Sequence, residues 1–148
     1  MSQATPGEIV QAGAVPFRWN GGRLEILLIT NSAGNRWQVP KGWVEHGLTP
    51  QETGAQEAWE EAGVRGKVHP HPLGFWTYRK RGLAYRVELF TMQVASVSDK
   101  FPEQDERARM WRPLDEAMTT IQDANLRLLV GNLPVFLSIH GMLPAASA

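Results

Sequence analysis

One short segment, residues 42–64, constrains this chain more than any other. Its second half predicts a helix, because Thr49 can act as the N-cap, Pro50 suits the first helical position and Glu52 completes a capping box. Gly63 is a natural stop, since glycine readily adopts the left-handed conformation that ends many helices. We therefore expect a helix that begins after Thr49 and ends at Gly63.

Three acidic residues share one side of this predicted helix. Glu57, Glu60 and Glu61 are spaced by three and four residues, which makes their side chains neighbours. Like charges this close repel, and the repulsion grows where a helix is partly buried. Mg²⁺ or Mn²⁺ would remove it, because both ions prefer oxygen ligands and readily bridge to phosphates. The triplet alone favours a solvated helix face, which is the usual fate of such a run.

The residues before the helix favour the metal interpretation. Residues 36–39 are typical of a short strand, and residues 40–47 are typical of a loop punctuated by glycine. A loop of this kind that leads into an acidic helix lets backbone carbonyls and carboxylates converge on one cation.

The segment resembles the Nudix box of the Nudix hydrolase family. The family pattern is Gly, five residues, Glu, seven residues, and then Arg-Glu-apolar-any-Glu-Glu-any-Gly-apolar. Correct spacing over a segment this long is far more specific than an isolated glycine motif. The matching positions are Gly42, Glu57, Ala58, Glu60, Glu61, Gly63 and Val64.

Two positions depart from the family pattern: Leu48 replaces the first Glu of the box, and Gln56 replaces its Arg. In the family this Arg helps to orient the first metal-binding Glu, and the missing Glu is a plausible ion-pair partner for it. Removing one member of a buried ion pair costs about 3–5 kcal/mol, whereas exchanging both is far cheaper. We therefore interpret Leu48 and Gln56 as a coupled replacement.

The resemblance implies an α+β fold, a Nudix-type α/β/α sandwich with a mixed β-sheet between helices. The length of 148 residues predicts a single domain over residues 1–148. The order of the predicted elements agrees, beginning with a hairpin whose turn is Asn20-Gly21-Gly22. Pro134 is expected to end or kink the last helix. The predicted strands are 9–19, 24–30, 64–68, 73–78, 85–97 and 110–111, and the later helices are 113–121 and 124–133.

The resemblance also implies Mg²⁺-dependent (or Mn²⁺-dependent) hydrolysis of a diphosphate linkage, with water attacking phosphorus. The implied metal ligands are the glutamates of the box and the Gly42 carbonyl. Glu60 or Glu61 would also accept the proton of the attacking water, and the residues leave this choice open. The metal-site residues are thus Gly42, Glu57, Glu60 and Glu61.

Family members often add a further acid from the loop before the returning strand. Glu106 is our choice for this catalytic role, and Asp105 is the reserve. The alternative is that Arg107 and Arg109 neutralise these acids, in which case the loop is simply a salt-bridged surface.

Cations outside the glutamate helix suit a phosphate-rich substrate, because Arg binds phosphate through paired hydrogen bonds and Lys acts as a point charge. The alternatives are a solvated loop lysine and an ordinary charged hairpin tip. Aromatic residues near them, Trp19, Trp76 and Tyr78, could stack on a base, although most aromatic residues belong to a core. The candidate substrate-binding residues are Lys41, Arg79, Arg81 and Arg86.

Within the family, residues 40–43, 59–63 and 111–117 look most like those of bacterial relatives of diphosphoinositol polyphosphate phosphohydrolases. The substrates of that class are diphosphoinositol polyphosphates and diadenosine polyphosphates. The Pro-Lys-Gly run at residues 40–42 is also seen in diadenosine polyphosphate hydrolases, which are the alternative within the enzyme class. More broadly, family members act on nucleoside diphosphates linked to another moiety. The competing hypothesis is a Nudix-fold nucleotide-binding or regulatory module whose catalysis has lapsed. Retention of all three helix glutamates favours the enzyme.

Composition limits the other partners. Lys plus Arg and Asp plus Glu both number 15, so no long-range attraction to a nucleic acid polymer or an anionic membrane is indicated. The chain has no cysteine, which fits a reducing cytoplasm. Residues 1–8 show no signal-peptide pattern, and the apolar run 133–143 is too short to span a bilayer. We therefore expect a cytoplasmic protein that binds a phosphate-rich small molecule.

Overall fold

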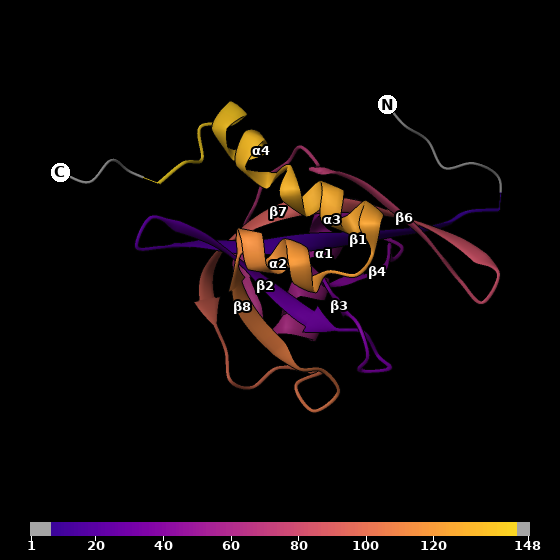
Figure 1. Ribbon diagram of the computed structural model, residues 1–148. Helices are drawn as coiled ribbons and strands as arrows, with labels where there is room; N and C mark the ends of the chain where they lie inside the picture. The colour runs from indigo at the N-terminus through magenta and orange to yellow at the C-terminus, as the bar shows by residue number, and fades with distance from the viewer. Residues whose placement is uncertain (1–6, 145–148) are drawn as a thin grey trace.

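The computed structural model describes residues 7–144, in which a mixed β-sheet lies between α1 on one face and α2, α3 and α4 on the other (Figure 1). This arrangement confirms the predicted α/β/α sandwich. The strands are β1 (Ile9–Asn20), β2 (Arg23–Thr30), β3 (Trp37–Gln38), β4 (Lys41–Trp43), β5 (Val64–Val68), β6 (Gly74–Lys80), β7 (Leu83–Val97) and β8 (Arg109–Pro113). The helices are α1 (Pro50–Ala62), α2 (Leu114–Thr120), α3 (Ala124–Gly131) and α4 (Leu133–Ile139).

The sheet is organised around β1. One edge of this strand pairs in parallel with β7, whereas the other edge pairs with β4 at residues 11–13 and with β2 at residues 17–20. Between these two pairings the Ala14 N–H donates to the Pro40 carbonyl (3.1 Å). Pro16 has its nitrogen on the same edge, since alternate residues of a strand face the same way. Its lack of an N–H costs nothing there, because β1 is changing partners.

The predicted hairpin between β1 and β2 is confirmed. Gly21 and Gly22 have φ values of 57° and 82°, as the favoured two-residue hairpin turn requires. The register that follows places Phe17 opposite Ile26. The hairpin thereby aligns the apolar positions of both strands on the same faces of the sheet.

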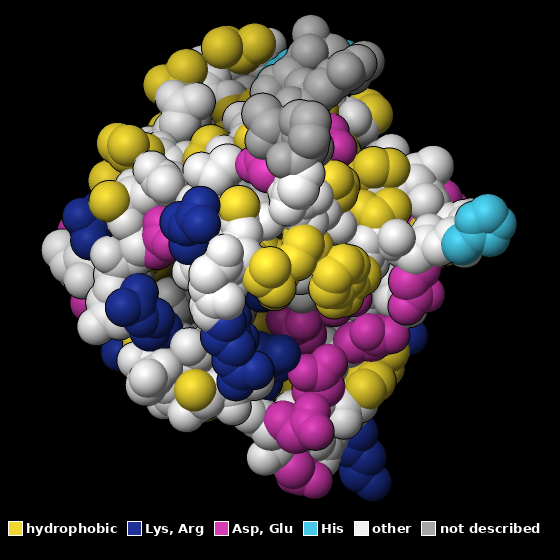
Figure 2. All heavy atoms as spheres, turned by 90° about the vertical axis from the view of Figure 1, so that its right-hand side faces the viewer, with side chains coloured by type: hydrophobic (Ala, Val, Ile, Leu, Met, Phe, Trp, Pro, Cys, Tyr) yellow, Lys and Arg dark blue, Asp and Glu magenta, His cyan; other side chains and the backbone are white. Residues whose placement is uncertain are grey.

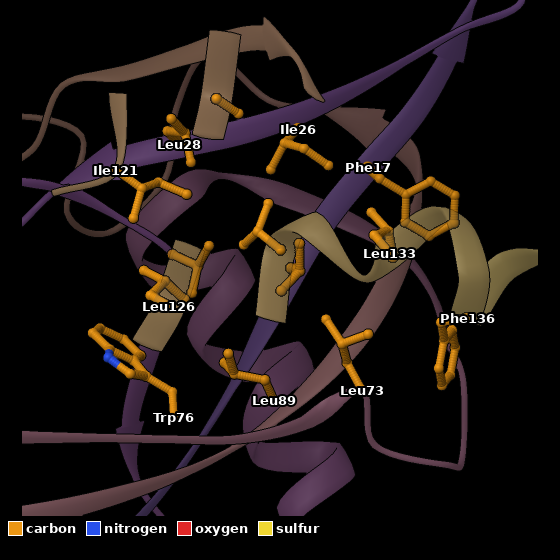
Figure 3. Packing of buried hydrophobic residues seen from close by; sticks show 14 of the residues in the cluster. Phe17, Ile26, Leu28, Leu73, Trp76, Leu89, Ile121, Leu126, Leu133 and Phe136 are labelled. Carbon is orange, nitrogen blue, oxygen red and sulfur yellow. The ribbon is translucent and has the colours of Figure 1, made fainter. Parts of the chain in front are cut away.

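Two hydrophobic clusters cover the opposite faces of the sheet. The smaller cluster joins Ala58 and Ala62 of α1 to residues such as Leu27. The larger cluster lies under α2, α3 and α4, and Figure 3 shows Leu126 and Leu133 of the helices beside strand residues. The strand residues labelled in that view include Phe17, Ile26, Leu28 and Leu89.

Two elements differ from the sequence prediction. The predicted loop at residues 40–47 contains a short strand, β4, because its backbone pairs with β1. The predicted helix 124–133 ends earlier, at Gly131, and a new helix starts at Leu133. Pro134 lies in the first turn of α4 rather than ending a helix, since a first-turn N–H has no partner within the helix.

Candidate active site

The ends of α1 are fixed as the sequence predicted. The Thr49 N–H donates to Glu52 Oε1 (3.0 Å) and the Glu52 N–H donates to Thr49 Oγ1 (3.1 Å), which completes the capping box. Gly63 has a φ of 68° and closes the helix. These caps set where the helix begins and ends, and therefore which side chains it presents to β4.

Glu57 lies directly against Gly42 of β4. A Cβ placed on Gly42 would come within 2.8 Å of Glu57 Oε2 and still closer to the other carboxylate oxygen. Any side chain at position 42 would thus displace the carboxylate. Gly42 and Glu57, the first of the three clustered glutamates, form one structural unit.

Glu61 is the most deeply buried carboxylate of this group, with 5% of its surface exposed. Its Oε1 accepts a long hydrogen bond from the Lys41 N–H (3.4 Å), and its Oε2 lies 3.5 Å from Arg107 Nη2. Burial raises the pKa of Glu61 to about 8; Arg107 opposes this shift and Glu57 adds to it. Burial likewise raises the pKa of Glu57.

Glu60 is half-buried and is held by a neutral partner. Gln56 Nε2 donates to Glu60 Oε1 (2.9 Å), one helical turn away. Gln56, which replaces the Arg of the family pattern, therefore orients one of the three helix carboxylates.

The loop acid that reaches this group is Glu103. Glu106 and Asp105 lie exposed, whereas the charge of Glu103 raises the pKa of both Glu57 and Glu61. The Glu103 N–H donates to the Glu60 carbonyl (2.9 Å), which attaches the loop to α1. Sequence reasoning missed Glu103 because three acids share this loop, and only the folded loop distinguishes them.

The donors present suit a hard divalent cation. The Glu57 carboxylate lies against the β4 backbone at Gly42, and a cation bound there would favour the ionised forms of Glu57 and Glu61, which burial disfavours. Within residues 7–144, no three acidic or histidine side chains already converge as ligands of one ion. Joint coordination therefore requires the glutamate side chains to rotate toward one another.

A cavity of about 360 Å³ opens beside these carboxylates, because Lys41 and Arg107 both line it and both contact Glu61. Figure 2 shows Lys and Arg side chains gathered next to Asp and Glu side chains on one face. Five cationic residues and one acidic residue line the cavity. They are Arg36, Lys41, Arg79, Lys80, Arg107 and Asp123.

Two of the four predicted substrate-binding cations line the cavity, namely Lys41 and Arg79. Lys41 Nζ lies 5.1 Å from the centre of the Tyr78 ring, and burial lowers the pKa of Lys41 while Glu61 opposes that shift. Arg81 instead sits in the exposed turn of the β6–β7 hairpin, with a φ of 52°. Arg86 is buried, and its guanidinium lies 4.1 Å from the Phe75 ring.

The position of Arg86 follows from the hairpin register. Arg86 pairs with Thr77, so its side chain lies on the opposite face of the sheet from Trp76 and Tyr78. Trp76 and Tyr78 do line the cavity, together with Trp37, which sequence reasoning did not select. Trp19 packs on the larger cluster and its Nε1 donates to the Met142 carbonyl (3.3 Å).

Comparisons with known proteins agree with this arrangement. The family described as NUDIX domain matches residues 8–130. Nudix hydrolase 17, mitochondrial, of Arabidopsis thaliana is 35% identical over 120 residues, which cover 75% of this chain and 65% of that protein. Diphosphoinositol polyphosphate phosphohydrolase 2 of Rattus norvegicus is 30% identical over 101 residues, 66% of this chain and 55% of that protein.

Among solved structures, the C. elegans Ap4A hydrolase binary complex superposes with a TM-score of 0.77. It is 23% identical in sequence, over 88% of this chain and 98% of that one, and so establishes the fold alone. The chain spans between about half and two thirds of the length of most of the curated relatives that it matches. The match over residues 8–130 shows that the chain belongs to the NUDIX domain family.

Proposed function

We propose that the chain is a pyrophosphohydrolase that uses Mg²⁺ or Mn²⁺ to cleave a diphosphate linkage in a phosphate-rich small molecule. The observation that carries this proposal is the contact between the Glu57 carboxylate and Gly42, beside the buried Glu61 and the cationic cavity. Family membership and the curated relatives named Nudix hydrolase support it.

Glu57, Glu60, Glu61 and the Gly42 carbonyl would hold the ion. A divalent cation bound there supplies charge neutralisation at phosphoryl oxygens and a lowered pKa for a bound water. The chain itself then orients the reactants, and a carboxylate oxygen of Glu60 or Glu61 accepts the proton of the water that attacks phosphorus.

The remaining roles fall to residues outside α1. Lys41 and Arg79 line the cavity and would bind phosphate groups of the substrate. Among the loop acids, the partly buried Glu103 suits a role beside the box better than the exposed Glu106 does.

The lining of the cavity indicates a polyanionic substrate. Five cationic residues against one acid fit several phosphates, and the Trp37, Trp76 and Tyr78 rings could contact a ring on the substrate. The proposed substrates are diphosphoinositol polyphosphates, diadenosine polyphosphates and nucleoside diphosphates linked to another moiety. The name of the rat relative supports the first of these.

The cellular setting stays a prediction. No helix within residues 7–144 combines the length and apolar character needed to cross a membrane. The names of the curated relatives include mitochondrial and chloroplastic proteins, so a cytoplasmic location is only our proposal.

The test is a panel of dinucleoside polyphosphates, inositol pyrophosphates, nucleotide sugars and nucleoside triphosphates, assayed with Mg²⁺ or Mn²⁺. We expect metal-dependent release of phosphate or nucleotide from at least one of them. Glu60→Gln should lower the turnover about 10²–10⁴-fold without unfolding the protein. Glu116→Gln, an exposed acid on α2, is the matched control and should retain turnover. Tight binding of one compound without turnover would instead establish the lapsed binding module.

A further inference from the structure

The helix that carries the acidic residues brings no cation of its own. Residues 50–62 contain four glutamates and neither lysine nor arginine. Gln56 donates to Glu60, but it is neutral and contributes no charge. Any positive charge that organises the carboxylates must therefore come from another element of the fold.

Arg107, in the loop between β7 and β8, supplies such a charge. Its Nη2 lies 3.5 Å from Glu61 Oε2, and its Nε donates to Glu103 Oε1 (2.8 Å). Its Nη1 donates to the Thr30 carbonyl at the end of β2 (2.9 Å). The planar guanidinium thus joins a helix acid, a loop acid and a strand end in one fixed arrangement.

The surroundings of Arg107 restrict its movement. Its side chain is 12% exposed. On either side the backbone is anchored, since the Ala108 N–H donates to Thr30 Oγ1 (3.1 Å) and the Glu103 N–H donates to the Glu60 carbonyl (2.9 Å). The guanidinium is consequently preorganised toward Glu61 by contacts that involve no carboxylate of α1.

We propose that Arg107 is a positioning residue for the metal site. Its guanidinium orients Glu61 and Glu103 and supplies the positive charge that α1 lacks. This inference rests on the proposed function. Without Arg107, the carboxylates of Glu57, Glu61 and Glu103 would face one another with no fixed cation between them. They would turn apart, and a divalent ion would bind a less ordered set of ligands.

Arg109 provides a matched control in the same part of the fold. Its Nη1 donates to the Ala62 carbonyl (2.8 Å) and its Nη2 donates to the Ser98 carbonyl (2.7 Å). It therefore attaches the same loop to the same helix through backbone carbonyls. Arg109→Gln should loosen the loop while leaving the ion pair of Arg107 with Glu61 intact.

The experiment measures Mn²⁺ binding to metal-free protein by electron paramagnetic resonance of the free ion, alongside thermal unfolding. Arg107→Gln should weaken Mn²⁺ binding about 10- to 100-fold. Arg107→Lys keeps the charge without the planar fork and should recover part of this loss. Arg109→Gln should lower the unfolding temperature and leave Mn²⁺ affinity within about twofold of the original protein.

The outcomes separate the two proposals. Absence of Mn²⁺ binding by the original protein would overturn the proposed function itself. Normal Mn²⁺ binding by the original protein and by Arg107→Gln would overturn the positioning role alone. Equal weakening by the Arg107 and Arg109 variants would also overturn it, since loop attachment would then explain the effect. If Arg107→Gln does not fold, Arg107→Lys decides between the same outcomes.

Discussion

The Glu57 carboxylate rests on the backbone of Gly42, so closely that the glycine has no room for a Cβ. A helix acid and a strand residue are thereby held in contact across the turn that joins them. The site depends on this contact as much as on the glutamates themselves.

Gly42→Ala should therefore displace Glu57 and weaken Mn²⁺ binding about 10- to 100-fold, because the new methyl group occupies the place of the carboxylate. The measurement is a Mn²⁺ titration of the metal-free protein. Gly47→Ala is the control: this glycine has a φ of +89° and nothing within 4 Å of its added Cβ. It should lower stability through backbone strain without changing affinity. Unchanged Mn²⁺ affinity in Gly42→Ala would contradict the contact described here.

Lys41→Ala should raise the KM for the substrate about tenfold or more, with a smaller change in kcat, because a charge-assisted hydrogen bond to phosphate is worth about 1.5–3 kcal/mol. Steady-state kinetics on the best substrate of the panel measures both constants. Lys100→Ala removes an exposed lysine that does not line the cavity and should leave both constants unchanged. An equal KM for the two variants would exclude Lys41 from phosphate binding.

The exchange at Leu48 and Gln56 is testable by a double-mutant cycle. If the two residues form a coupled replacement, Leu48→Glu and Gln56→Arg should each lower the free energy of unfolding more than the double variant does. The reason is that each single variant introduces an unpaired charge. Gln56→Arg also removes the amide that donates to Glu60 Oε1. The free energy of unfolding and the turnover are the two readouts, and strictly additive effects on both would discard the coupling.

The stability of the metal-free protein should fall as the pH rises through about 8. Burial raises the pKa of Glu61 from 4.5 to about 8, so the folded state binds more protons than the unfolded state between these values. The stabilisation that the raised pKa of Glu61 contributes is fully present below about pH 4.5, and it is lost as the pH rises through the pKa of Glu61 in the folded state. Urea unfolding in EDTA from pH 6 to pH 9 measures it. Glu61→Gln should flatten the profile, and a profile with the same slope would rule out Glu61 as its source.

Core packing under the terminal helices makes a simpler prediction. Leu133 is fully buried in the larger cluster, so Leu133→Ala should lower the free energy of unfolding by about 2–5 kcal/mol. Leu128 is 73% exposed on α3, and Leu128→Ala should change the free energy of unfolding by less than about 0.5 kcal/mol. Urea denaturation compares the two variants, and equal effects would show that α4 does not close the core.

The features that the sequence could predict are those set by local geometry. The caps of α1 and the common side of Glu57, Glu60 and Glu61 depend only on residues within a few positions of one another. The β1–β2 hairpin followed from its two glycines for the same reason. Strand β4 was missed, because its three residues become a strand only through pairing with β1, far away in the sequence.

The same distinction explains which choices at the site the sequence left open. Choosing among Glu103, Asp105 and Glu106 required the path of the loop, which the hydrogen bonds of Arg107 and Arg109 determine. Arg86 and Arg79 looked equivalent in the sequence, but Arg86 is buried beside the Phe75 ring, whereas Arg79 is exposed near the end of β6 and lines the cavity. Arg107 looked like a neutraliser of surface acids, and only its contact with Glu61 connects it to the helix.

The two edges of β1 have different roles in this fold. The parallel pairing with β7 continues through Pro16, whereas β4 and β2 meet the other edge on either side of that residue. The cavity is walled largely by segments beyond those pairings, residues 31–38 and the end of β6 among them. Insertions or deletions in these segments can reshape what the cavity accepts while leaving every hydrogen bond between β1 and β7 in register. Changes in these peripheral segments can thus alter which ligand is bound, while the central pairing of β1 with β7 stays the same.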